Sequence, residues 1–219
     1  MINCNEKPKV IGTFTFDNTE TEVMNYLYFP IFMAGKSSKS FVSLEPRLEK
    51  YRKMIQFAID KEEYPFKYIY LSAKTMYVGP GITGNRPGWH CDGFGTEDIT
   101  YVWADQSPTL FSHGEFNDIS TDHNESLKQF EEIAEKNEIY SFPVNSLIRL
   151  TPRVVHHTPK IWEPGLRSFV KISFSDLKYN LKGNTKNYML DTSDWKLYDR
   201  KEIRNDPAYS NTDHGPQKC

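Results

Sequence analysis

The sequence predicts a mainly β protein, built as a sandwich or barrel with two helices, and three observations support this. Short runs rich in β-branched and aromatic residues recur along the chain, separated by Gly, Pro, Asn and Asp. Two segments have the apolar spacing of amphipathic helices. The 219 residues are 38% hydrophobic with a net charge of −2, so the chain can bury a sizeable core and is unlike a disordered protein.

The order of the predicted elements follows from these patterns. The runs that predict strands cover residues 10–16, 68–78, 99–103, 147–150, 153–157 and 168–174. A helix is expected over residues 44–59, with Ser43 as its N-cap, and a second over residues 124–137, entered through Ser120, Thr121 and Asp122. Both helices are expected to serve packing.

No internal repeat and no change of composition divides the chain. We therefore expect one domain over residues 1–204. Residues 205–219 are polar and lack a pattern, and we expect them to form a mobile C-terminal tail.

The cysteines and the hydropathy indicate the compartment. Cys4, Cys91 and Cys219 are far apart and lack C-x-x-C spacing, which excludes a disulfide framework and a zinc site built from thiolates. The most apolar stretch, residues 26–34, is too short to span a bilayer. We expect a cytoplasmic protein without a membrane partner.

Two separate segments carry the candidate chemistry. His90 and Asp92 stand two residues apart, so in a strand both side chains would point to the same face and could share a metal ion. The pair His156-His157 ends an apolar run, and Arg167 opens the next predicted strand. The combination is more specific than the His-x-Asp pair alone.

On these residues the sequence resembles the Fe(II)- and 2-oxoglutarate-dependent dioxygenases, over roughly residues 74–175. The resemblance implies a double-stranded β-helix, the jelly-roll or cupin-like fold, with about eight core strands and flanking helices. It implies that His90, Asp92 and His156 are the iron ligands of a 2-His-1-carboxylate triad. It also implies that Arg167 pairs with the distal carboxylate of 2-oxoglutarate, and that Tyr77 is a further candidate for binding this cosubstrate.

The double histidine leaves a choice of distal ligand, because adjacent side chains in a strand face opposite sides. The family often has one histidine, a variable residue, a small polar residue and then proline. His156, followed by His157, Thr158 and Pro159, fits that order better than His157 does. His157 would then face solvent or support the site.

The resemblance implies a reaction that consumes O2 and releases succinate and CO2. Because Asp92 is present, no position is freed for halide, so hydroxylation, desaturation or cyclisation is expected. With a net charge of −2 the chain lacks the positive field that nucleic acids need. We expect a small polar substrate, amino-acid-like or a natural-product intermediate, enclosed by the loop of residues 79–88.

Several alternatives stay open at this stage. The same fold could be a cupin-like metal-binding or ligand-binding protein without oxygenase activity, although such a protein has no evident need for Arg167. The histidines could be structural residues of a β-sandwich, or the oxygenase could act on a protein or a nucleobase. His113 and Glu115 form a second His-x-carboxylate pair, in a loop. A nucleophilic hydrolase is disfavoured because no G-x-S-x-G motif occurs.

Overall fold

The structure is a computed structural model that describes residues 1–17, 22–37, 42–80, 82, 85, 87–161 and 163–199. The predicted tail, residues 205–219, lies outside the described residues, as do four residues of the 79–88 loop, including Arg86. The chain divides into two compact units. The first comprises Met1–Asn25 and Lys74–Lys171, and the second comprises Tyr26–Ala73 and the chain from Ile172 onward.

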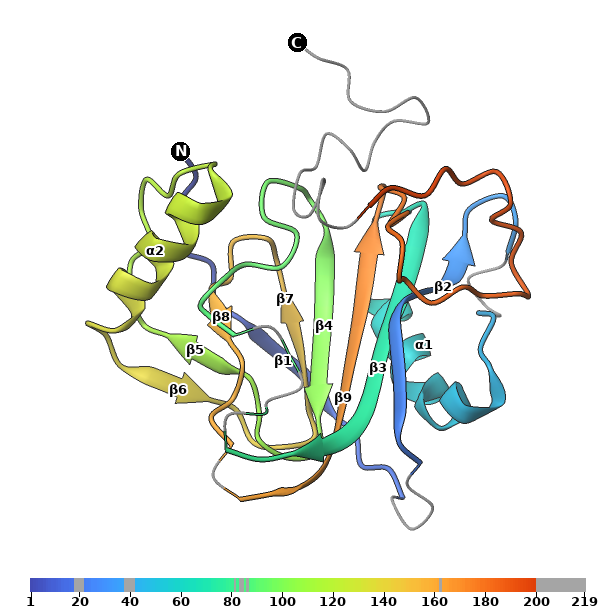
Figure 1. Ribbon diagram of the computed structural model, residues 1–219, viewed down its shortest axis with the longest axis horizontal. Coiled ribbons are helices and arrows are strands. Elements are labelled where there is room, and N and C mark those ends of the chain that lie inside the picture. Colours follow the sequence, from blue (N-terminus) through green and yellow to red (C-terminus); the bar gives the residue numbers. More distant parts are fainter. Residues whose placement is uncertain are drawn as a thin grey trace. The chain divides into compact units, whose positions relative to one another are not determined.

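The first unit contains most of a large sheet with the strand order β1-β7-β4-β9-β3 (Figure 1). Its strands are β1 (Lys9–Thr13), β7 (Ser146–Leu150), β4 (Ile99–Ala104), β9 (Gly165–Ser175) and β3 (Tyr68–Val78), the last two continuing into the second unit. The β1–β7 and β4–β7 pairs are antiparallel. Each of these strands was expected from the sequence to within a few residues.

The first unit also contains a three-stranded antiparallel sheet in the order β6-β5-β8. Its strands are β6 (Ile139–Ser141), β5 (Leu110–Ser112) and β8 (His156–His157). The strand expected over residues 153–157 is shorter than predicted, because Val154 N–H donates to the carbonyl of Thr151 in a turn at 3.1 Å. Strands β5 and β6 were not predicted, since three residues are too few to show alternation.

An apolar cluster joins the two sheets of this unit. Val102 of β4 and Ile148 of β7 lie opposite each other in the register, and both belong to a buried cluster with Phe111 of β5. Leu150 and Val154 complete the cluster. The two antiparallel sheets thus share a core, as the sheets of a sandwich or jelly roll do. The predicted fold class, mainly β with a jelly-roll arrangement and flanking helices, is confirmed.

Helix α2 (His123–Ala134) belongs to the first unit and begins where the sequence predicts. The Asp122 carboxylate accepts hydrogen bonds from the N–H groups of Asn124 and Glu125, both at 2.9 Å, which caps the helix. Phe130 and Ala134 are buried on its inner face.

The second unit contains the other predicted helix and one further strand. A 3-10 turn, η1 (Pro46–Tyr51), leads into α1 (Arg52–Lys61), where one helix over residues 44–59 was expected. Within this unit the strand order continues β9-β3-β2, and β2 (Met24–Met33) contains the most apolar stretch of the sequence. In the described part of the chain, no helix is long and apolar enough to cross a membrane.

Candidate metal centre

The His90–Asp92 segment is not a regular strand, which corrects the reason for expecting its two side chains on one face. His90 forms a single antiparallel bridge with His156. Asp92 instead begins a turn, which Thr96 closes by donating its backbone N–H to the carbonyl of Gly93 at 2.9 Å. Gly93 has a φ of +66°, and a Cβ there would lie 2.9 Å from Thr96 Oγ1, so the turn requires glycine.

The residues beside the two histidines determine which way the imidazoles point. Trp89, Cys91 and Val155 are buried in a second apolar cluster, which Phe130 of α2 also joins. In the sequence, His90 lies between Trp89 and Cys91, and His156 directly follows Val155. Their side chains therefore project to the other side, where the two rings lie 4.6 Å apart.

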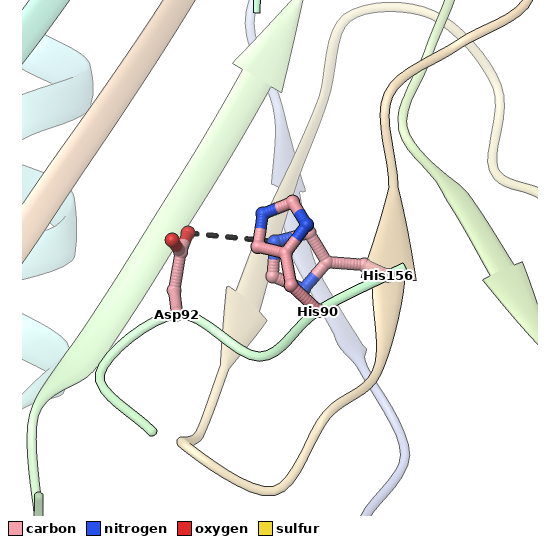
Figure 2. A group of neighbouring side chains, drawn as sticks. All are labelled: His90, Asp92 and His156. Atoms are coloured by element: carbon pink, nitrogen blue, oxygen red, sulfur yellow. Dashed lines mark ion pairs between the residues drawn. The ribbon is translucent and has the colours of Figure 1, made fainter. Parts of the chain in front are cut away.

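The three candidate ligands converge there, as Figure 2 shows. One ligand atom from each of His90, Asp92 and His156 lies within 4.8 Å of the others, and His156 Nε2 is 3.5 Å from Asp92 Oδ2. His156 comes from β8, whereas His90 and Asp92 come from the loop and turn between β3 and β4 (Figure 2). The side chains of His156 and Asp92 are only 7% and 17% exposed.

Backbone carbonyls orient both imidazoles. His90 Nδ1 donates to the carbonyl of Gly88 at 2.8 Å, and His156 Nδ1 donates to the carbonyl of Val154 at 3.0 Å. A neutral imidazole with its proton on Nδ1 keeps a lone pair on Nε2. The Nε2 of His156 faces Oδ2 of Asp92 at 3.5 Å, so a metal ion held between these two atoms would be bound by both.

The charges of the site suit a divalent metal. Burial lowers the pKa of His90 to about 3, so this ring is neutral at physiological pH. Burial would raise the pKa of Asp92, but the Lys171 ammonium, 2.7 Å from Oδ1, and then His156 hold that pKa well below its usual value. Two imidazoles and one carboxylate are the ligand set of non-haem iron(II) sites.

His157 points away from this group. Its Nε2 accepts a hydrogen bond from the N–H of Gly88 at 3.3 Å, and its ring lies 5.2 Å from that of Trp89. Of the two neighbouring histidines, the structure therefore places His156 with His90 and Asp92. His157 supports the loop that carries His90.

Arg167 is buried near the start of β9 with an incompletely paired guanidinium. The residue is 2% exposed, and its Nε donates to the carbonyls of Gln106 and Ser107 at 3.0 and 3.2 Å. Its Nη2 is buried and has no hydrogen-bond partner in the structure. Burial lowers its pKa to about 10, so the group is still cationic at neutral pH. The charge of Asp105 acts in the opposite direction on this pKa, but the Nη2 donor still has no acceptor, and an anionic ligand would supply one.

Arg167 faces the same interior as the three candidate ligands. Its guanidinium lies over the ring of Phe169, 5.1 Å from the centroid, and Phe169 packs against the cluster that contains Phe111. The ring of Phe111 is in turn 6.5 Å from that of His156. Lys171 lies two residues beyond Phe169 on the same face of β9, because side chains alternate along a strand.

Two cations of this interior were not predicted from the sequence. Lys171 contacts Asp92, and Lys74 on β3 has a pKa lowered by burial and then by the charges of Lys171 and Arg167. A signal for Lys171 was present, since Arg167 and Lys171 are four residues apart in one predicted strand and must share a face. Nothing in the sequence pairs Lys171 with Asp92.

Other candidate residues lie elsewhere. Tyr77 is 64% exposed, and its odd separation from Lys74 along β3 turns it to the opposite face, so the structure does not bring it to the triad. His113 is exposed and stacks on Tyr140 at 4.3 Å. Among the described residues, the group with metal-binding geometry comprises His90, Asp92 and His156, without His113 and Glu115.

Comparisons with known proteins add little to the geometry. No protein-family model matches the chain, and no curated protein matches it significantly. Among solved structures, it is similar to a 2OG-Fe(II) oxygenase family oxidoreductase from Burkholderia pseudomallei, with 10% identity, a TM-score of 0.34 and 66% of this chain covered. The match spans 65% of that protein. AviO1 from Streptomyces viridochromogenes Tue57 has 14% identity and a TM-score of 0.34, with 73% of this chain and 77% of that chain covered.

Proposed function

We propose that the protein is an iron(II)- and 2-oxoglutarate-dependent oxygenase with His90, Asp92 and His156 as metal ligands. The observation that carries the proposal is the combination of this triad with the unsatisfied guanidinium of Arg167 in one buried interior. A metal-binding protein needs only the triad, whereas an enzyme that binds a dicarboxylate cosubstrate needs the triad and the guanidinium.

The residues present fit the metal. The Nε2 atoms of His90 and His156 are oriented by carbonyl acceptors, and Asp92 is ionised. Three protein ligands leave further coordination positions for exchangeable groups. When bound, iron(II) would supply the activation of dioxygen. The cosubstrate 2-oxoglutarate would supply two electrons as it is converted to succinate and CO2.

The residues present also fit the cosubstrate. A guanidinium keeps its charge and pairs with both oxygens of a carboxylate, and the buried Nη2 of Arg167 has such donors to offer. The carbonyls of Gln106 and Ser107 hold the Nε side of the group and thereby fix the plane of the fork. Arg167 would bind the carboxylate of 2-oxoglutarate that lies away from the metal.

The surrounding side chains exclude water from the reaction. Phe111 is fully buried beside His156, and Phe169 lies between Arg167 and that core. In such an apolar surrounding the charged groups interact more strongly, and a reactive oxidant is shielded from solvent. The substrate we propose is a small polar molecule, amino-acid-like or a natural-product intermediate, which is hydroxylated, desaturated or cyclised in the cytoplasm.

Turnover of the cosubstrate tests the proposal. Purified protein loaded anaerobically with iron(II) is mixed with 2-oxoglutarate and air, and succinate and CO2 are measured. We expect slow release of both in equal amounts even without substrate, and none from Asp92→Ala. Succinate at the background level of iron alone would contradict the proposal.

The competing function is a cupin-like metal-binding protein that does not use 2-oxoglutarate. It accounts for the triad but leaves the buried Nη2 of Arg167 without an acceptor. Equilibrium binding of 2-oxoglutarate to the metal-loaded protein under nitrogen separates the two, because the cupin-like alternative predicts no binding that depends on Arg167.

A further inference from the structure

We propose that Lys171 is a positioning residue of the metal centre. It holds one oxygen of Asp92, so that the carboxylate presents only its other oxygen to the metal. This inference rests on the proposed function, since it requires a metal at His90, Asp92 and His156.

The two oxygens of Asp92 have different surroundings. Oδ1 lies 2.7 Å from Nζ of Lys171, the length of a strong charge-assisted hydrogen bond. Oδ2 lies 3.5 Å from Nε2 of His156 and so is the oxygen that faces the other candidate ligands. The side chains of Lys171 and Asp92 are 13% and 17% exposed, which protects their contact from solvent.

The position of Lys171 in the sheet supports a dedicated role. Lys171 shares the inward face of β9 with Arg167 and Phe169, a face on which an apolar side chain would be cheaper to bury. Taking an ammonium out of water is strongly destabilising unless a partner compensates for the lost hydration. Asp92 is that partner, so the lysine and the candidate ligand are buried as a pair.

Asp92 needs such an anchor because its own backbone does not belong to the sheet. It begins the turn that Gly93 and Thr96 close, whereas Lys171 projects from a long central strand. Groups that orient a ligand commonly change metal affinity by about 10–100-fold when removed. Lys171, on the rigid strand β9, therefore fixes the position of the Asp92 carboxylate, whose backbone lies in a turn.

Single-oxygen coordination has a consequence for the reaction. If both oxygens of Asp92 bound the metal, one more coordination position would be closed. With Oδ1 held by Lys171, that position is available to an exchangeable ligand, as the use of both 2-oxoglutarate and dioxygen requires.

A simple charge effect makes the opposite prediction, and this allows a decisive test. If Lys171 acted only as a nearby cation, its removal would reduce repulsion and strengthen the binding of a divalent metal. If it positions Asp92, its removal weakens binding. Lys74 is the matched control, because it belongs to the same group of cations. The charges of Lys171 and Arg167 both act on it.

The experiment is an anaerobic titration of the metal-free protein with manganese(II), an oxygen-stable substitute for iron(II). Thermal unfolding first verifies that each variant is folded. We expect Lys171→Met to bind about 10–100-fold more weakly than the parent. Lys171→Arg, which keeps charge and donors, should recover most of this loss, and Lys74→Met should bind as tightly as the parent or more tightly.

Water-proton relaxation at saturating manganese provides a second readout that a purely structural role would not change. It should fall in Lys171→Met, because the released Oδ1 displaces a bound water. Lys171→Gln carries the same affinity test if the methionine variant does not fold. Parent-like or tighter binding in the uncharged variants overturns the role of Lys171, whereas absence of metal binding by the parent overturns the proposed function itself.

Discussion

His90 and His156 exchange a pair of backbone hydrogen bonds, from N–H of His90 to the carbonyl of His156 at 3.0 Å and in the reverse direction at 2.9 Å. Residues opposed in this way have side chains on the same face of the pair. Two candidate ligands from distant parts of the sequence are thus brought together by the backbone. A metal ion bound by both imidazoles would therefore require no change in the backbone.

This pairing leads to a prediction about the ligand set. His90→Ala, Asp92→Ala and His156→Ala should each weaken iron(II) binding by more than the roughly 100-fold that loss of an orienting partner causes. His157→Ala should bind iron within a few-fold of the parent, because His157 contacts Gly88 instead of the triad. Anaerobic titration measures each affinity. If His157→Ala lost the metal and His156→Ala kept it, the distal ligand would be the other histidine.

The sequence predicted the ligand candidates better than it predicted their geometry. The His-x-Asp spacing and the later His-Arg order pointed to these residues, and the preference for His156 over His157 came from the resemblance to the dioxygenases. The strand-face argument for Asp92 was wrong, because Gly93 and Thr96 turn the chain at that point. Tertiary contacts bring Asp92 to the histidines, and the spacing of residues along the sequence does not predict such contacts.

The fold was predicted to a similar extent. Long strands such as β3 and β9 show their β-branched and aromatic runs, and Asp122 marks the start of α2. Strands β5 and β6 have three residues each and are stabilised by their neighbours, so no local pattern announces them. Lys171 was missed for the same kind of reason, since its role depends on Asp92, which is 79 positions away in the sequence.

The orphaned donor of Arg167 predicts a specific defect. Arg167→Met should lose on the order of 2–5 kcal/mol of 2-oxoglutarate binding, the cost of removing one partner of a buried charge pair, which corresponds to about 30- to 5,000-fold in affinity. Iron(II) affinity should change little, because the guanidinium does not belong to the ligand group. Anaerobic binding assays measure both constants. Arg153→Met, at a half-exposed arginine that pairs with Glu6, is the control.

The cap of α2 predicts a stability effect that is independent of the metal site. The carboxylate of Asp122 accepts from two backbone N–H groups, so Asp122→Ala should cost about 1 kcal/mol. For a chain of this size, this lowers the melting temperature by about 2–4 °C. Differential scanning calorimetry measures the change, with Thr121→Ala, an exposed position just outside the helix, as control. Equal melting temperatures for Asp122→Ala and the parent would show that the cap contributes nothing.

The charge balance predicts weak binding of nucleic acids. Such binding draws much of its strength from phosphate neutralisation, and a chain with a net charge of −2 has no overall positive field to supply it. Fluorescence anisotropy with labelled single- and double-stranded oligonucleotides at about 150 mM salt should give no submicromolar affinity. Tight binding that weakens steeply with salt would instead favour an oxygenase that acts on nucleobases.

The buried imidazole of His90 predicts how the stability of the metal-free protein depends on pH. The pKa of His90 is about 3 in the folded protein, against an ordinary value of about 6.5 in the unfolded chain. Between these values the unfolded state binds a proton that the folded state does not, so the free energy of unfolding falls as the pH falls. Lowering the pH from 7 to 5 should therefore cost about 2 kcal/mol from this group.

Urea denaturation of chelator-treated protein at the two pH values measures this loss. His90→Asn removes the titrating ring, so the difference between pH 7 and pH 5 should shrink in this variant by about the same 2 kcal/mol. His113→Asn, at an exposed histidine that stacks on Tyr140, is the matched control and should keep the parent's dependence. If His90→Asn and the parent lost equal stability on acidification, the imidazole of His90 would be protonated as readily in the folded protein as in the unfolded chain. Its Nε2 would then be a poor metal ligand at mildly acidic pH, because metal ions bind the neutral ring.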